Sequence, residues 1–108
     1  MTSHDDINRR SLELACAVVR RVDADPQHAA LADARRRCER WLQTAPCSDL
    51  LQWKKLLLQP WDAVRAVLLD PSETGQRLRQ SNPFCGVLTP RERWDVYRRT
   101  RRHDAQPA

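Results

Sequence analysis

The chain has 108 residues, of which 41% are hydrophobic and 31% are charged, and its formal net charge is +5. The apolar fraction is too high for a disordered chain, and the charged fraction is too high for a membrane protein. The longest apolar run, from Ala63 to Leu69, is interrupted by Arg65 and is far shorter than the roughly 20 residues that span a bilayer. Because the N-terminus also lacks the basic and then apolar plan of a secretory signal, we expect a cytoplasmic protein that does not enter membranes.

Two amphipathic helices are predicted in the first half of the chain. Between about Asp5 and Val22 the apolar residues recur on one helical face, and the neighbouring arginines lie away from that face. Asp25-Pro26 then supplies a capping carboxylate and a proline at the first helical position, and Ala45-Pro46 stops the second helix. The apolar stripe of that second helix consists of Leu31, Ala34, Cys38, Trp41 and Leu42.

Shorter helices are predicted in the middle of the chain. Ser48 is a capping residue for one helix, and Pro60 either ends that helix or opens the next one. Asp70-Pro71-Ser72-Glu73 repeats the capping pattern, with an acid three residues after the cap. The helix that it opens runs through Leu78 and is weakened by Gly75.

An irregular segment follows at residues 81–86. Pro83 restricts the backbone of Asn82, and Gly86 permits a turn. Apolar residues anchor the segment in this prediction. We therefore treat Pro83, Phe84 and Val87 as a candidate loop for contact with a partner.

The last predicted helix begins at Thr89. Thr89 caps it, Pro90 occupies the first helical position, and Glu92 can reach back to the Thr89 amide. No paired runs of alternating β-branched residues flank a hairpin turn anywhere in the chain. We therefore predict one all-α domain over residues 1–108, an irregular bundle of five or six short helices, ordered over about 5–102 and frayed at 1–4 and 103–108.

The four cysteines are too widely spaced for a zinc site of the finger or ribbon type. No two of them form a Cys-x-x-Cys pair, and the nearest two, Cys38 and Cys47, have no histidine beside them. We expect neither a bound metal nor a cofactor. Cys16 and Cys38 lie among apolar residues, where a reduced cysteine behaves as a small hydrophobe.

Positive charge gathers in two places, around residues 35–40 and at the C-terminus. Arginine outnumbers lysine seventeen to two, which fits recognition of phosphate or carboxylate by forked donors, but coding bias in a GC-rich genome would produce the same excess. The arginines of the second group are concentrated on the last predicted helix. The candidate site for a nucleic acid or an acidic partner comprises Arg98, Arg99, Arg101 and Arg102, together with Arg37 and Arg40.

Four tryptophans supply most of the aromatic content, and we expect most of them in the core. Trp94 and Tyr97 lie three residues apart, a spacing that usually faces the core of a helical protein. On that basis, removal of the chain after Leu88 would unfold the domain. The alternative is that Trp94 and Tyr97 form a stacking surface for unpaired bases, interleaved with Arg93 and Arg98.

Two short segments resemble known families. Leu88-Thr89-Pro90-Arg91-Glu92-Arg93 resembles the opening of the helix-turn-helix domain in LuxR-type regulators, but the recognition helix of that family would have to fit in the fifteen residues that follow. We assign no DNA-reading residues from it. Arg98 and His103 are separated by four residues, which is similar to the arginine-to-histidine signature of HEPN-type ribonucleases. That resemblance implies an arginine that stabilises charge on an RNA phosphodiester and a histidine that transfers a proton.

Three functions are therefore open. The first, which we favour, is a non-enzymatic protein-interaction module that binds a protein partner or a second copy of itself, with regulation as one role open to it. The second is nucleic-acid binding by the basic C-terminal helix, with an affinity that falls steeply with salt. The third is the ribonuclease activity implied by Arg98 and His103. No catalytic residues are assigned under the first hypothesis.

Overall fold

Six α-helices form the part of the chain that the computed structural model describes, residues 4–105, with only the backbone described at residues 4–6 and 101–105. No strand occurs in this part of the chain, so the prediction of an all-α bundle of five or six helices is confirmed. Residues 4 and 103–105, which were expected to be frayed, belong to the first and last helices, and the remaining expected frayed residues, 1–3 and 106–108, lie outside the described residues. The helices are α1 (His4–Asp23), α2 (Ala29–Thr44), α3 (Ser48–Leu56), α4 (Trp61–Leu68), α5 (Glu73–Gln80) and α6 (Pro90–Ala105).

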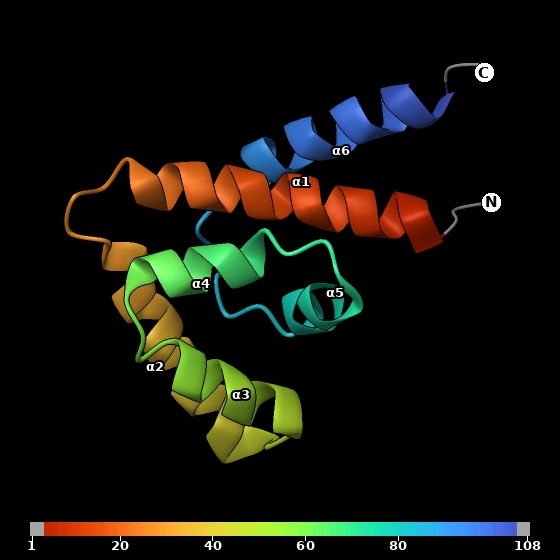
Figure 1. The fold of residues 1–108 in the computed structure, drawn as a ribbon. Coiled ribbons are helices and arrows are strands. Elements are labelled where there is room, and N and C mark those ends of the chain that lie inside the picture. Colours follow the sequence, from red (N-terminus) through yellow and green to blue (C-terminus); the bar gives the residue numbers. More distant parts are fainter. Residues whose placement is uncertain (1–3, 106–108) are drawn as a thin grey trace.

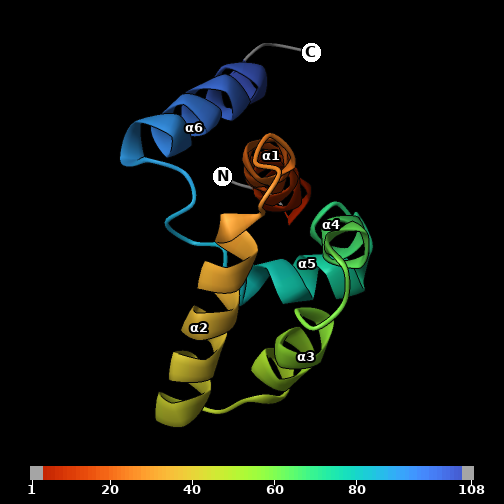
Figure 2. The same ribbon diagram turned by 90° about the vertical axis from the view of Figure 1, so that its left-hand side faces the viewer.

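Helix α1 lies in the middle of the molecule and has helices on two sides (Figure 1). Helix α6 packs antiparallel along one side of α1, while α2, α4 and α5 contact the other side. Figure 2 shows the same arrangement from a second direction, with α6 and α2 separated by α1. The radius of gyration is 14.4 Å, against roughly 13 Å expected for a chain of this length, in keeping with a helix that packs mainly against one neighbour.

The core is centred on two tryptophans and Phe84. The Phe84 ring meets Trp53 and Trp61 edge-on, at centroid distances of 6.3 and 6.0 Å. Both indole N–H groups are satisfied: Trp53 donates to the Leu78 carbonyl and Trp61 to the Asp23 carboxylate, each at 2.7 Å. The bond from Trp61 lowers the pKa of Asp23. The prediction of core tryptophans is thus confirmed for Trp53 and Trp61.

A buried arginine connects three parts of the bundle. Arg79 in α5 is only 6% exposed, and its guanidinium donates to Ser11 and Asn8 of α1, each at 2.7 Å. It also donates to the backbone carbonyls of Leu68 and Asp70, where α4 ends. Burial lowers the pKa of Arg79, and the polar acceptors around it compensate for the water that it has lost.

Three of the predicted helix starts differ in detail from the structure. The Asp25 carboxylate accepts from the Ala29 amide at 2.9 Å, but Pro26 lies in the turn before α2 rather than inside it. Ser48 is the first residue of α3 and makes no capping bond, since Cys47 occupies the cap position. In α5 the cap is Ser72, whose hydroxyl accepts from the amide of Gly75.

Gly75 also has a different role from the one predicted. A β-carbon at this position would lie 2.1 Å from the carbonyl oxygen of Asp70. The helix therefore requires glycine here, because the segment between α4 and α5 passes directly against its first turn. Glycine lowers the helix propensity of α5, but a residue with a β-carbon would not allow this close approach.

Candidate functional site

Helix α6 begins with the capping box that the sequence predicts. The Thr89 amide donates to Glu92 Oε1 at 3.0 Å, and the Glu92 amide donates to the Thr89 hydroxyl at 3.1 Å. Glu92 also forms an ion pair with Arg21 near the end of α1. The bond from the Thr89 backbone, followed by the bond from Arg21, lowers the pKa of Glu92. One carboxylate thus both starts α6 and attaches it to α1.

The contact between α6 and α1 is the most extensive between two helices of the described residues, yet it buries few side chains of α6. Among the α6 side chains that the structure describes, Val96 and Thr100 are buried. Arg10 of α1 donates to the Thr100 hydroxyl at 3.3 Å, and its guanidinium lies 5.6 Å from the centre of the Tyr97 ring. Among the described side chains of α6, one apolar residue, Val96, and a few polar contacts attach the helix to α1.

Trp94 and Tyr97 are not core residues, and the prediction that placed them there was wrong. The Trp94 side chain is 55% exposed and that of Tyr97 is 37% exposed. The spacing of three residues was interpreted correctly as one face of a helix, but a different face of α6 is turned to α1. Trp94 lies about 200° around the helix axis from Glu92 and from Val96, so it points away from α1.

The arginines predicted on α6 differ in their surroundings. Arg98 forms an ion pair with Asp95, one turn earlier on the same helix. Arg99 is exposed and lines a cleft between α6 and α1. Arg101 and Arg102 belong to α6, but their side chains lie outside the described residues.

The two arginines predicted on α2 do not join those on α6. Arg37 donates to the Pro83 carbonyl at 2.7 Å and so holds the segment before α6 in place. Arg40 is exposed and lines, with Arg37, a depression of about 460 Å³ along α2 whose rim also carries Asp33 and Glu39. Because α1 separates α2 from α6, the predicted site is divided between two sides of the molecule (Figure 2).

The candidate partner loop is mostly buried. Pro83 and Phe84 are both almost completely inaccessible, and the Phe84 ring fills the centre of the core. Val87 is half-buried and packs against the same cluster. These residues therefore anchor the loop to the protein, and Pro83 and Phe84 are inaccessible to a partner in this conformation.

The cysteines have unlike environments. Cys38 is buried and donates weakly to the Leu50 carbonyl at 3.5 Å, and burial raises the pKa of its thiol. Cys16 is half-buried, and Cys47 and Cys85 are exposed. No three His, Cys, Asp or Glu side chains come together for a metal ion in the described part of the chain.

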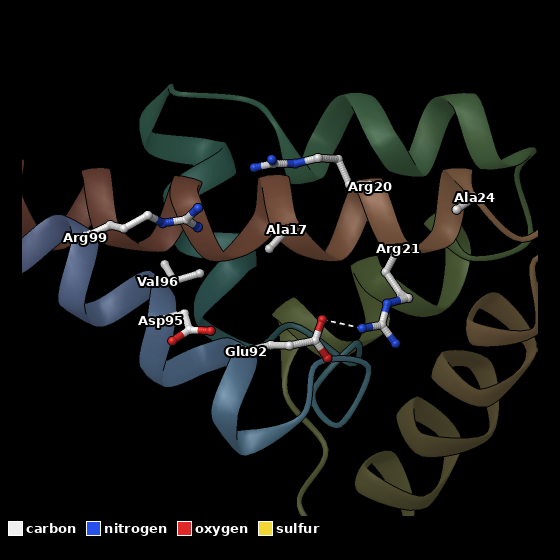
Figure 3. Close-up of a pocket in the computed structure, with 8 residues that line it drawn as sticks. All are labelled: Ala17, Arg20, Arg21, Ala24, Glu92, Asp95, Val96 and Arg99. Atoms are coloured by element: carbon white, nitrogen blue, oxygen red, sulfur yellow. Dashed lines mark hydrogen bonds and ion pairs between the residues drawn. The ribbon is translucent and has the colours of Figure 1, made fainter.

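A cleft of about 380 Å³ lies between α1 and α6. Figure 3 shows it from the side, with Arg20 and Arg21 entering from α1 and Arg99 from α6. Arg20 and Arg21 were not predicted to belong to a site, because on α1 alone they are simply the solvent-facing residues of an amphipathic helix. The residues that line the cleft are Ala17, Arg20, Arg21, Ala24, Glu92, Asp95, Val96 and Arg99.

The molecule is thus an all-helical protein with a basic, aromatic helix attached to one side of its core. No helix in the described residues combines the length and apolar character needed to cross a membrane. A comparison with protein-family models finds no match to the chain, and neither do comparisons with curated proteins and with solved structures.

Proposed function

We propose that the chain is a protein-binding module that contacts its partner, a different protein or a second copy, with α6 and the adjoining part of α1. The exposed indole of Trp94 carries the proposal. Tryptophan, tyrosine and arginine are the residues most enriched where protein interfaces concentrate their binding energy. Trp94 and Tyr97 supply the aromatic area on α6, and Arg98 borders it.

The distribution of charge supports a protein partner over a nucleic acid. A surface that binds phosphates needs several arginines free of internal acids, whereas Arg98 pairs with Asp95 and Arg21 pairs with Glu92. Most arginines of the basic cluster on α2 also have partners within the protein. Arg35 donates to the Leu57 carbonyl at 2.6 Å, Arg36 pairs with Asp33, and Arg37 holds Pro83.

Nucleic-acid binding is the second candidate function, and the exposure of Trp94 favours it as well. Bases stack on exposed aromatic rings, and Arg93 and Arg98 adjoin Trp94 and Tyr97 on the helix. The ribonuclease hypothesis stays a prediction, because the side chain of His103 lies outside the described residues. On a regular helix, Arg98 and His103 would be about 140° apart around the axis, which gives that hypothesis no support.

Affinity purification from the cells that make this protein tests the proposal. The tagged wild-type chain should retain one protein in stoichiometric amount after nuclease treatment, and Trp94→Ala should lose it. Leu58→Ser is the matched control, since Leu58 is a similarly exposed apolar residue outside α6. It should retain the partner.

The possible results separate the candidates. Recovery of the same protein with Trp94→Ala would reject the proposed function, as would recovery of no protein with a wild-type chain that is also monomeric in solution. Nuclease-sensitive recovery of RNA or DNA that requires Trp94 would establish the second candidate instead. A mass measurement of the purified wild-type chain in solution shows whether the partner is a second copy.

A further inference from the structure

The cleft between α1 and α6 contains two acids that already have partners. Glu92 is bound by Arg21 and by the Thr89 amide. Asp95 is paired with Arg98, which extends from α6 beyond the cleft. Neither carboxylate therefore forms an ion pair with the other two arginines of the cleft.

Those two arginines, Arg20 and Arg99, come from different helices and point toward one another across the cleft (Figure 3). Arg20 donates through Nε to the Cys16 carbonyl at 3.4 Å, which leaves the outer nitrogens of its guanidinium free for a ligand. Among the described residues no carboxylate forms an ion pair with either side chain. Two like charges that converge in this way repel each other, and a bound anion between them would convert that repulsion into two attractive contacts.

The floor of the cleft is apolar. Ala17 of α1 and Val96 of α6 line it near the arginines, and Ala24 lines it farther along α1, beyond Arg21. A volume of about 380 Å³ is within the ordinary range of ligand sites. This combination suits a ligand that carries a carboxylate next to short apolar groups, which is the chemistry of a peptide.

We propose that the cleft binds an acidic segment of a protein partner, with an Asp or Glu carboxylate held between Arg20 and Arg99 and small apolar side chains on the floor. This inference rests on the proposed function, because it assigns the chemistry of the partner. A chain of phosphodiesters fits less well, since its backbone offers no short apolar side chains for Ala17 and Val96. The positive net charge of the whole chain favours the approach of an acidic segment.

Titration with a labelled peptide in which glutamates alternate with alanines tests the inference. At low salt, the peptide should shift the Nε–H NMR signals of Arg20 and Arg99. Arg20→Gln and Arg99→Gln should each weaken binding about tenfold, the loss of one charge-assisted contact. The same peptide with glutamine in place of glutamate should bind no better to the wild-type chain than to these variants.

Arg36→Gln is the matched control, because Arg36 is an exposed, ion-paired arginine on α2. It should bind the acidic peptide as the wild type does. Failure of the wild-type chain to bind the peptide, or equal loss in all three arginine variants, would overturn the inference. Equal shifts with inorganic phosphate, or tighter binding of single-stranded RNA, would also overturn it by assigning the cleft to phosphate.

Trp94→Ala distinguishes failure of this inference from failure of the proposed function. Trp94 lies outside the cleft, so this variant should still bind the peptide while it loses the cellular partner. If Trp94→Ala loses the cellular partner and the peptide shifts neither arginine signal, the cleft assignment is wrong and the proposed function stands. If Trp94→Ala keeps the partner, the proposed function fails by its own test.

Discussion

Glu92 illustrates how one side chain can serve the backbone and the tertiary structure together. Its Oε1 atom accepts from the Thr89 amide, and its Oε2 atom pairs with Arg21. Both contacts favour the ionised carboxylate, and they lower the pKa of Glu92 below its ordinary value of 4.5. The attachment of α6 to α1 is consequently sensitive to acid.

We predict that Glu92→Gln removes a pH-dependent part of the stability. Because the pKa is lower in the folded than in the unfolded chain, this stabilisation is fully present above about pH 4.5 and is lost as the pH falls through the folded pKa. Urea unfolding should therefore show wild type more stable than the variant at neutral pH, with the difference vanishing in acid.

Glu39→Gln is the control for this prediction, since Glu39 is an exposed carboxylate on α2. Its unfolding should follow the wild type across the same pH range. A constant difference between wild type and Glu92→Gln at every pH would contradict the assigned role of the charge.

At the scale of elements, α6 is attached differently from the other helices. The main hydrophobic cluster draws on α1 to α5 and on the loop that carries Phe84 and Leu88, whereas Val96 is buried apart from it. With Trp94 and Tyr97 exposed, removal of α6 leaves the core aromatics in place. The expectation that the domain would unfold without α6 loses its physical basis.

A chain that ends at Leu88 should fold and unfold cooperatively at a lower temperature than the intact chain. The expected loss is at least about 1.5–3 kcal/mol from the burial of Val96. The polar contacts of Thr100 and the face of α1 that α6 covers add to it. Circular dichroism during thermal unfolding measures it. Leu68→Ala in the intact chain is the comparison, since it deletes part of a fully buried core residue and should cost about 2–5 kcal/mol. A broad, non-cooperative transition in the shortened chain would show that α6 is part of the core.

At the scale of the whole molecule, Arg79 joins elements that are distant in sequence. Its guanidinium satisfies two side chains of α1 and the two carbonyls at the end of α4. The side chain is buried and its acceptors are partly shielded from water. Removing it would leave several polar atoms without their partners.

Arg79→Met should lower the free energy of unfolding by at least about 3 kcal/mol, since each buried group left unsatisfied costs roughly 1–3 kcal/mol. Arg79→Lys should not restore stability, because one ammonium group cannot reach all four acceptors that the planar guanidinium of Arg79 contacts. Urea unfolding at neutral pH measures both variants. Arg77→Met, two residues earlier and exposed in an ion pair with Asp49, should change stability by no more than about 1 kcal/mol. Similar values for the variants at 77 and 79 would refute the role of Arg79.

The helices of this protein could be predicted because their determinants are local. The capping box of Thr89 and Glu92 lies within four consecutive residues, and the apolar stripes of α1 and α2 repeat at helical spacing. The predictions that were wrong in detail also concerned short segments of sequence. The need for Gly75 depends on how the segment between α4 and α5 passes the helix, whereas α2 starts after Pro26, where the Asp25 carboxylate accepts from the Ala29 amide.

The sequence by itself determined the all-helical class, the approximate segments that form helices and the concentration of arginine on the last one. Only the tertiary structure decided what those arginines do: Arg37 holds a loop, Arg98 pairs along its own helix, and Arg99 meets Arg20 across a cleft. It also decided that Trp94 faces solvent. The physical reason is that periodicity specifies only the faces of one helix. Which neighbour covers each face depends on packing between segments that are distant in sequence, such as Arg21 and Glu92, which are 71 positions apart.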